Sequence, residues 1–369
     1  MINKLVLENL KDRWVRTLLS ALVVGVQVMS ILTLIGLSRG MLQESAAHAK
    51  GTAADIFLKP DSQGTFSFST GQLSEKFVDF LAKQPHVKQA VGVLMSPIQG
   101  ELITPMNGVD IPRFEKMSGG FRYLAGGPPQ APDDLIVDEY YARQHKLHVG
   151  QIVKLLNHNW RVCAVVQGGV LGRLIVQLST LQRLTANAAP PRVSEILVKL
   201  DNPALTDQEV AHFNQLLRGN LQAVSMEAFV SQFSVNNIPQ LRAFIYVITV
   251  IAVIVGFLVV FLSMYTAVIE RTREIGILKA LGAKPLTILD ILVREAVVLA
   301  LVGCILGIAF SFGTKALIMT FMPASLHAVN VPDWWPIAGA IALAGALLGA
   351  TYPGLKAARQ DAIEALAYE

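Results

Sequence analysis

Three histidines in the long polar segment of this chain have a spacing that could bind a metal ion. His145 and His148 are separated by two residues, and His158 follows nearby. A tetrahedral zinc site needs further histidine, cysteine or carboxylate ligands, but no cluster completes the set. The two cysteines, Cys163 and Cys304, lie in unlike segments, so a disulfide is not expected either. We expect no metal site and interpret the histidines as surface residues of a turn.

The patterns that mark an enzyme are absent from the sequence. No GxxxxGK[ST] phosphate-binding loop occurs, so the chain is not expected to hydrolyse ATP by that route. The lysines, serines and acids of the polar segment form no nucleophile and base pattern, and we expect no catalytic residue. Basic runs interleaved with aromatic residues are also absent, so the net charge of +4 is no argument for nucleic acid.

Four uncharged apolar segments dominate the chain. Of 369 residues 53% are hydrophobic and 16% charged, and the mean hydropathy is +0.48. Each uncharged segment is long enough to cross roughly 30 Å of hydrocarbon as a helix. The alternatives are buried core helices and, for the first segment, a signal peptide, but four such segments with Arg or Trp at their flanks favour membrane spans. The uncharged segments are residues 17–38, 243–269, 296–314 and 336–355. The predicted transmembrane helices have the same bounds except for the third, which is predicted to extend over residues 288–320.

Basic residues in the short polar segments predict the orientation of these helices. Lysine and arginine gather before the first span, after the second span and in the C-terminal tail, while the connection after the third span has one basic residue at its edge. By the positive-inside rule both termini are cytoplasmic. Residues 1–16 are interpreted as an amphipathic helix along the inner membrane surface or a simple extension of the first span, and residues 356–369 as a cytoplasmic tail.

Residues 39–240 have an ordinary globular composition and are predicted to form an α+β extracytoplasmic domain. The segments ADIFLKP, QIVKLLNHNWRVCAVVQGG and VSEILVKL are strand-like, whereas EKFVDFLAKQ and DQEVAHFNQLLRG are helix-like. Phe229 and Phe233 are one helical turn apart, so we expect a helix that continues into the second span and forms a stalk with Met41 to Lys50. The predicted fold class is an α-helical membrane protein with four transmembrane helices and this large domain between helices 1 and 2.

The charged segment from Glu270 to Lys284 separates the second and third spans. Its six charges would cost on the order of 15–20 kcal/mol in hydrocarbon, so it must lie outside the bilayer. Ile275, Leu278 and Leu281 follow at three-residue spacing, and Gly282 with the following Pro285 ends the helix. The stripe either lies in the lipid headgroups or inserts into a groove of a soluble motor protein.

At the rim of such a groove we expect Arg271, Arg273 and Lys279. No Asp, Glu, Lys or Arg lies inside the uncharged segments, so a proton or ion relay that could drive transport is not expected. Energy must then come from outside the spans, and the charged segment is the candidate place to receive it.

The segment ERTREIGILKALGAKPLTILDILVREAVVLALVGCILG closely resembles the C-terminal signature of the MacB/FtsX-like (type VII) permeases of ABC transporters. In that family an E-R-x-x-E-I-G-[IL]-x-[KR]-A-[LI]-G-A motif forms the coupling helix. Glu295 stands where the family commonly has a glutamate opening its third span. LIVDEYYARQHKLHVGQIVKL and WRVCAVVQGG are similar to the family's extracytoplasmic domain. On this basis the ATPase-coupling residues are Glu270, Arg271, Arg273, Glu274, Ile275, Leu278, Lys279, Leu281 and Gly282.

The resemblance implies a dimer of permeases in the inner membrane, bound to two copies of a cytoplasmic ATPase that carries the ATP and Mg²⁺. No fused ATPase domain is present in the sequence, so we expect a separate partner chain and no cofactor bound by this one. The second permease is a copy or a paralogue, and a periplasmic adaptor and membrane lipid are further expected partners. Small-residue spacings for close helix packing occur at Gly303, Gly307, Gly345 and Gly349.

The expected function is export or extraction of a hydrophobic or amphipathic substrate such as a lipoprotein, lipid, haem, peptide or antibiotic, driven by ATP hydrolysis on the partner. The alternative is a subunit that transmits force to regulate cell-wall hydrolases or signalling. A membrane-anchored enzyme has no catalytic constellation to support it.

Overall fold

The computed structural model describes residues 8–9, 11–60, 73–98, 101–219, 221–322, 324 and 326–359. Residues 1–7 and 10 of the predicted N-terminal amphipathic helix and residues 360–369 of the predicted tail lie outside this part. The chain divides into a helical unit of Met1–Ser38, Pro239–Leu317 and Ala328–Glu369 and an α/β unit of Arg39–Ile238 and Ile318–His327.

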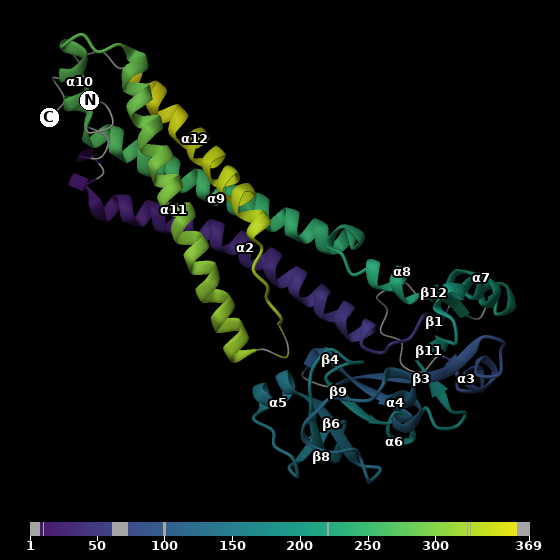
Figure 1. Ribbon diagram of the computed structural model, residues 1–369. Coiled ribbons are helices and arrows are strands. Elements are labelled where there is room, and N and C mark those ends of the chain that lie inside the picture. The colour runs from purple at the N-terminus through teal and green to yellow at the C-terminus, as the bar shows by residue number, and fades with distance from the viewer. Residues whose placement is uncertain are drawn as a thin grey trace. The chain divides into compact units, whose positions relative to one another are not determined.

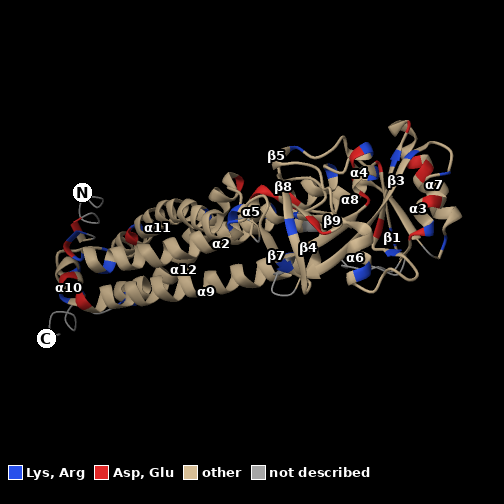
Figure 2. Ribbon diagram, turned by 90° about the horizontal axis from the view of Figure 1, so that it is seen from below, with Lys and Arg blue, Asp and Glu red and all other residues tan. Residues whose placement is uncertain are grey.

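The helical unit is built on long apolar helices (Figure 1). Its elements are α2 (Trp14–Lys50), α9 (Pro239–Glu270), α10 (Thr272–Ala280), α11 (Pro285–Phe321), η3 (Pro332–Trp334) and α12 (Trp335–Arg359). In the described part of the chain four helices, α2, α9, α11 and η3 with α12, are long and apolar enough to cross a membrane. Figure 2 shows charged residues gathered around α10 and few along α9, α11 and α12. The predicted fold class is confirmed; where the bilayer crosses each helix stays a prediction.

Glycines let the long helices of this one chain approach closely. A Cβ built at Gly303 would lie 2.7 Å from Val24 Cβ, and one at Gly307 would lie 2.6 Å from the Gly25 carbonyl oxygen, so α11 packs directly on α2. A Cβ at Gly349 would lie 3.0 Å from the Phe257 carbonyl oxygen, which places α12 against α9. Gly345 has more room, with its nearest neighbour 4.0 Å away. The predicted packing glycines thus serve helix contacts within one chain.

The α/β unit alternates short strands and helices. Its strands are β1 (Ile56–Pro60), β2 (Leu73–Ser74), β3 (Val87–Ile98), β4 (Glu101–Val109), β5 (Tyr123–Gly126), β6 (Asp134–Asp138), β7 (Ile152–Leu155), β8 (His158–Val166), β9 (Leu174–Gln177), β10 (Arg192–Val193), β11 (Glu195–Leu200) and β12 (Leu221–Ser225). Its helices, besides the end of α2, are α3 (Lys76–Leu81), α4 (Ile111–Ser118), α5 (Glu139–His145), α6 (Leu178–Leu184), η1 (Pro203–Leu205), α7 (Thr206–Leu216), α8 (Met226–Ser231) and η2 (Val235–Asn237).

Ten of the described strands form one sheet in the order β12-β1-β11-β3-β4-β9-β6-β8-β5, with β7 paired to β8. The pairs β4–β9 and β6–β8 are parallel and the others are antiparallel. Successive side chains of a strand point to opposite faces, and here both faces are apolar: Ile56 and Leu58 belong to one buried cluster and Phe57 to the other. The sheet is therefore covered on both sides, which fixes its register.

The strand-like and helix-like segments predicted in this domain are found as β1, β7 with β8, β11, α3 and α7. The expected continuous stalk helix through Phe229 and Phe233 is wrong. Helix α8 ends at Ser231 and α9 begins at Pro239, because Phe229 turns inward and stacks on Phe57 with ring centroids 4.1 Å apart. Phe233 meets Phe229 edge-on at 5.1 Å. Packing of Phe229 against the sheet is thus incompatible with a helix that continues into α9.

The C-terminal end of α2 is held in the α/β unit by a buried arginine. Arg173, directly before β9, pairs with Glu44 of α2 and with Asp138, whose Oδ2 lies 2.8 Å from Arg173 Nη1. Asp138 also caps α5, since its Oδ1 accepts the Tyr141 N–H at 2.7 Å. We call Arg173, Asp138 and Glu44 the Arg173 cluster.

Candidate functional site

Helix α10 is separated from α9 by a single residue and from α11 by a tight turn. Arg271, with φ of −113°, breaks the helix between Glu270 and Thr272. At the other end Gly282 adopts φ of +90°, and the Ala283 N–H donates to the Leu278 oxygen and the Gly282 N–H to the Lys279 oxygen. This pair of bonds is a Schellman motif, which requires a left-handed residue. The predicted helix end at Gly282 is thereby explained.

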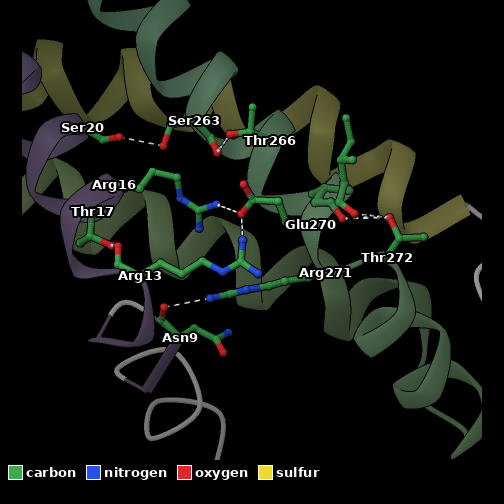
Figure 3. A network of polar contacts seen from close by, with 12 residues as sticks. Asn9, Arg13, Arg16, Thr17, Ser20, Ser263, Thr266, Glu270, Arg271 and Thr272 are labelled. Atoms are coloured by element: carbon green, nitrogen blue, oxygen red, sulfur yellow. Dashed lines mark hydrogen bonds and ion pairs between the residues drawn. The ribbon is translucent and has the colours of Figure 1, made fainter. Parts of the chain in front are cut away.

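A buried ion pair fixes the start of α10 to α11. Arg271 Nη1 lies 3.0 Å from Glu295 Oε1, and both side chains are buried. Asn9 Nδ2 donates to the same carboxylate oxygen at 2.7 Å. Arg271 Nη2 donates to the Asn9 carbonyl at 2.8 Å (Figure 3). We call Arg271, Glu295 and Asn9 the Arg271 cluster. Removing one partner of such a pair is costly, because the other charge stays buried without compensation.

The end of α9 is tied to the start of α2 by a second, more exposed network. Glu270 accepts a hydrogen bond from Arg16 at 2.8 Å and also pairs with Arg13 (Figure 3). One turn or two further into the spans, Ser20 and Ser263 are joined at 2.7 Å between their hydroxyl oxygens. Because Glu270 is about half exposed, each surface pair stabilises little on its own. Together these contacts align α2 and α9 beside α10.

The inner face of α10 packs on the ends of the long helices. Ile275 belongs to a buried cluster with Val268 of α9, Ile288 and Leu292 of α11 and Ala357 of α12. Lys279 Nζ donates to the Ala358 carbonyl at 2.8 Å, as basic residues often do at a helix C-terminus. Helix α10 is therefore held by α9, α11 and α12 at once.

The outer face of α10 is exposed and partly apolar. Leu281 is 80% exposed and Ile277 45% exposed. Arg273, Glu274 and Lys284 are also exposed around them. Large apolar side chains bare to this extent beside charged ones form a surface typical of an interaction site. We call Ile277 and Leu281 with these charged neighbours the α10 outer face.

The structure divides the predicted coupling residues into two groups. Arg273, Glu274 and Leu281 lie on the α10 outer face; Leu278 and Lys279 are half-buried, and Gly282 shapes the turn. Ile275 and Arg271 are buried against this chain's own helices, so they support α10 from its inner side; their part in coupling stays a prediction. Glu270 is directed to Arg13 and Arg16. Along the predicted stripe, Ile275 is therefore buried, Leu278 is half-buried and Leu281 is exposed.

The sequence gave no contact partner for Glu295, which was singled out only by the family resemblance, and no role beside α10 for Asn9, Arg13, Arg16 or Ile277. Asn9, Arg13 and Arg16 are distant from α10 in sequence, and no local pattern reveals their contacts. Ile277 could have been found, because Ile277 and Leu281 have the four-residue spacing of one helical face.

The histidine trio does not assemble into a metal centre. His158 Nε2 lies 2.9 Å from Asp133 Oδ1, and His145 stacks on Tyr141 with ring centroids 4.2 Å apart. Among the described residues no group of three or more His, Cys, Asp or Glu side chains could hold a metal ion. Burial raises the pKa of the Cys163 thiol to about 12, so its reactive thiolate form is disfavoured.

Two family models match the chain. The model for the FtsX-like permease C-terminal region matches residues 246–362, which include α10, and the model for the MacB-like periplasmic core domain matches residues 17–216. These two matches cover most of the helical unit and most of the α/β unit.

Relatives match over nearly the whole chain or over part of it. The macrolide export ATP-binding/permease protein MacB of Escherichia coli is 23% identical over 99% of this chain and 60% of its own length. The ABC transporter permease YtrF of Bacillus subtilis is 40% identical over 22% of this chain and 19% of its own length. The solved periplasmic region of MacB from Actinobacillus actinomycetemcomitans covers 50% of this chain and 94% of that chain at 14% identity, with a TM-score of 0.38. The chain thus spans about 60% of the length of the MacB relative that it matches throughout.

Proposed function

We propose that this chain, which belongs to the MacB/FtsX-like permeases of ABC transporters, receives mechanical work from a cytoplasmic ATPase through α10. The observation that carries the proposal is the two-sided character of α10. Its inner face is fixed to α9, α11 and α12, whereas its outer face leaves Ile277 and Leu281 bare. Because the inner face of α10 is packed on these helices, a force applied to its outer face would move them together with α10.

The basic residues of the helical unit support a cytoplasmic position for α10. Contacts bring the start of α2, the end of α9, the start of α11 and the end of α12 together around α10. Arginines and lysines are concentrated at these ends, and such residues are enriched on the cytoplasmic side of a membrane. The termini are then cytoplasmic and the α/β unit extracytoplasmic.

The α10 outer face has the composition expected of a helix that docks in a groove. Ile277 and Leu281 are one turn apart and would supply the apolar anchor, and Arg273, Glu274 and Lys284 would lie at its rim. ATP and Mg²⁺ would be held by the partner. Two ATPase copies would act on two permeases, the second being a copy of this chain or a paralogue.

Movement of α10 would reach the extracytoplasmic domain through α2. Glu270 joins α9 to Arg13 and Arg16, and the Ser20–Ser263 hydrogen bond joins the same two helices. Helix α2 continues without interruption from Trp14 to Lys50, and its last residues belong to the α/β unit. A tilt imposed at its start is thereby carried to Glu44 and the Arg173 cluster.

The favoured outcome of this motion is export or extraction of a hydrophobic or amphipathic substrate. The second candidate is force transmission without transport. The uninterrupted α2 helix supports both candidates equally, because each requires movement to pass along it. Substrate-stimulated ATPase activity in a reconstituted complex supports transport, whereas a cell-wall hydrolase that co-purifies with the α/β unit and no substrate stimulation supports the second candidate.

The coupling role is tested by charging the bare anchor. Replacing both Ile277 and Leu281 with Asp should weaken ATPase binding by several hundredfold, since each of the two anchors of a docking helix contributes about 2 kcal/mol. The full chain is purified from native membranes, and the accompanying nucleotide-binding subunit is detected by photolabelling with azido-ATP.

The matched control is Ile152→Asp, because Ile152 is 67% exposed on β7 of the α/β unit and receives the same change. Both variants should insert in the membrane at wild-type levels. Recovery of an equal amount of labelled ATPase with the double variant would reject the coupling role of α10.

A further inference from the structure

A hollow lies at the ends of the spans opposite α10. It is lined by α2, by the C-terminal part of α11 and by residues 328–331 with Trp335. Residues 328–331 run directly along α2: the Val329 N–H donates to the Gly36 oxygen at 3.1 Å. A Cβ at Gly36 would lie 2.4 Å from the Val329 oxygen, so only glycine permits this approach. The hollow is thus built by packing within the helical unit.

The wall of this hollow contains a threonine hydroxyl, that of Thr33. Ser30 and Ser38 of α2 donate to the carbonyl oxygens of Val26 and Leu34, both at 2.8 Å. The Oγ1 of Thr33, on the same helix, is buried and makes no hydrogen bond within the part of the chain described here. Leaving a buried hydroxyl unsatisfied is costly. A ligand atom in the hollow would satisfy it.

A cation without a counter-charge lines the same hollow. Lys315 of α11 forms no ion pair with any described residue, and no carboxylate lies among the residues that line the hollow. Asn330 adds an amide. Snorkelling to the membrane surface explains a lysine at a helix end, but it explains neither the enclosing hollow nor the orphaned Thr33 hydroxyl.

The remaining wall is apolar and aromatic. Phe312 and Trp335 meet edge-on with ring centroids 6.0 Å apart. Ile305, seven residues before Phe312 on the same face of α11, is 68% exposed, and Phe312 is 44% exposed. Aromatic and basic residues of this kind concentrate at the level of lipid headgroups. The site therefore combines a donor-rich pocket for an anion with an apolar track that leads from it along the span.

We propose that this hollow binds the phosphate group of an anionic phospholipid. Lys315 pairs with the phosphate, Thr33 Oγ1 donates a hydrogen bond to one of its oxygens, and the acyl chains lie along Phe312 and Ile305. An anionic headgroup is favoured over a zwitterionic one, because the lining offers no carboxylate to a headgroup ammonium. The bound lipid joins α2 to α11 and the 328–331 segment. This proposal does not depend on the coupling role of α10.

The test measures which lipids stay with the full chain. The protein is reconstituted in bilayers of one part phosphatidylglycerol to four parts phosphatidylcholine, extracted in mild detergent and analysed by native mass spectrometry. Wild-type protein should retain phosphatidylglycerol in preference to phosphatidylcholine. Lys315→Gln should lower the bound phosphatidylglycerol roughly fivefold, the size expected for one interfacial lysine, while Lys315→Arg retains it.

Two further variants keep the result interpretable. Thr33→Val removes the hydroxyl at constant shape and should also lower retention, whereas Thr33→Ser should not. Arg39→Gln, a charge removal one turn beyond Gly36 on α2 but outside the lining residues, is the matched control and should have no effect.

The proposal is overturned if Lys315→Gln and Arg39→Gln lower retention equally, since the lysine would then act only as part of a general surface charge. It is also overturned if wild-type protein shows no preference between the two lipids. Addition of millimolar inorganic phosphate distinguishes the source of the anion: displacement of the lipid by free phosphate would show a phosphate site rather than a lipid site.

Discussion

Two buried arginines hold helix ends in this chain, and they differ in how their charge is balanced. In the helical unit Arg271 faces one carboxylate, Glu295, and the amide of Asn9 completes the set. In the α/β unit Arg173 faces two carboxylates, Asp138 and Glu44. The first cluster is neutral as a whole and the second carries one excess negative charge when both acids are ionised.

The excess charge has a measurable consequence in the α/β unit. Burial, which outweighs the favourable effect of the Arg173 charge, raises the pKa of Asp138 to about 6, and Glu44 adds to the rise. The Arg173 cluster is thus expected to respond to pH in the range where cells work. The α/β unit therefore holds α2 through a contact whose charge changes near pH 6, whereas the helical unit holds α10 through one pair of opposite charges.

The largest expected effect follows from breaking the balanced pair. Arg271→Met leaves the Glu295 carboxylate buried without a cation and should lower the free energy of unfolding by about 3–5 kcal/mol. Unfolding is followed in mixed micelles of mild detergent and dodecyl sulfate.

The double variant Arg271→Met with Glu295→Met is the control, since it removes both charges and retains volume. It should recover most of the loss. If the single variant costs less than about 1 kcal/mol, or the double variant is no more stable than the single one, the pair does not hold α10 as described.

A pH-dependent effect should distinguish the Arg173 cluster. The pKa of Asp138 in the folded chain is about 6, above the value of about 4 in an unfolded chain. The folded state therefore binds more protons, so the stability that Asp138 contributes is complete below about pH 4 and is lost as the pH rises through about 6. The difference of about two pKa units corresponds to on the order of 2–3 kcal/mol.

The measurement is the urea midpoint of the α/β unit in the full chain, read from the fluorescence of Trp160, with the other three tryptophans changed to Phe. Trp160 is fully buried in the same core cluster as Tyr141 and Val137. The urea midpoint of the wild-type protein should decrease as the pH is raised from about 5 to about 7.5. In Asp138→Asn the Asn oxygen can still cap α5, and the fall should largely disappear. Parallel pH profiles for the two proteins would contradict the raised pKa.

The same contrast separates what the sequence could predict from what it could not. The four spans follow from uncharged runs of bilayer length, and α10 follows from six charges between two of them. Strands β1 and β11 were visible because both faces of the sheet are apolar and rich in β-branched residues. Each of these signals is local.

The orientation of α10 was not predictable, because it depends on contacts between distant segments. Arg271 points inward on account of Glu295 and of Asn9 near the N-terminus. A helix of nine residues has too few turns to fix its buried face from periodicity. A stripe through Ile275 at three-residue spacing and a face with Ile277 and Leu281 at four-residue spacing were therefore equally compatible with the sequence. The hollow lined by Thr33 and Lys315 was not predictable for the same reason, because one of its walls is a segment nearly 300 residues later in the chain that runs along α2.

The smallest expected effect concerns Glu270, the exposed counterpart of the Arg271 cluster. Its side chain is 47% exposed, although it meets both Arg13 and Arg16. Solvent and salt screen such a pair, so Glu270→Gln should lower the free energy of unfolding by less than about 1 kcal/mol. In the same mixed micelles this difference should vanish when the salt is raised from about 0.05 M to about 0.5 M, whereas the loss in Arg271→Met should persist. A salt-resistant loss in Glu270→Gln as large as that of Arg271→Met would mean that the α2–α9 contact, and not the buried pair, holds this end of the helices together.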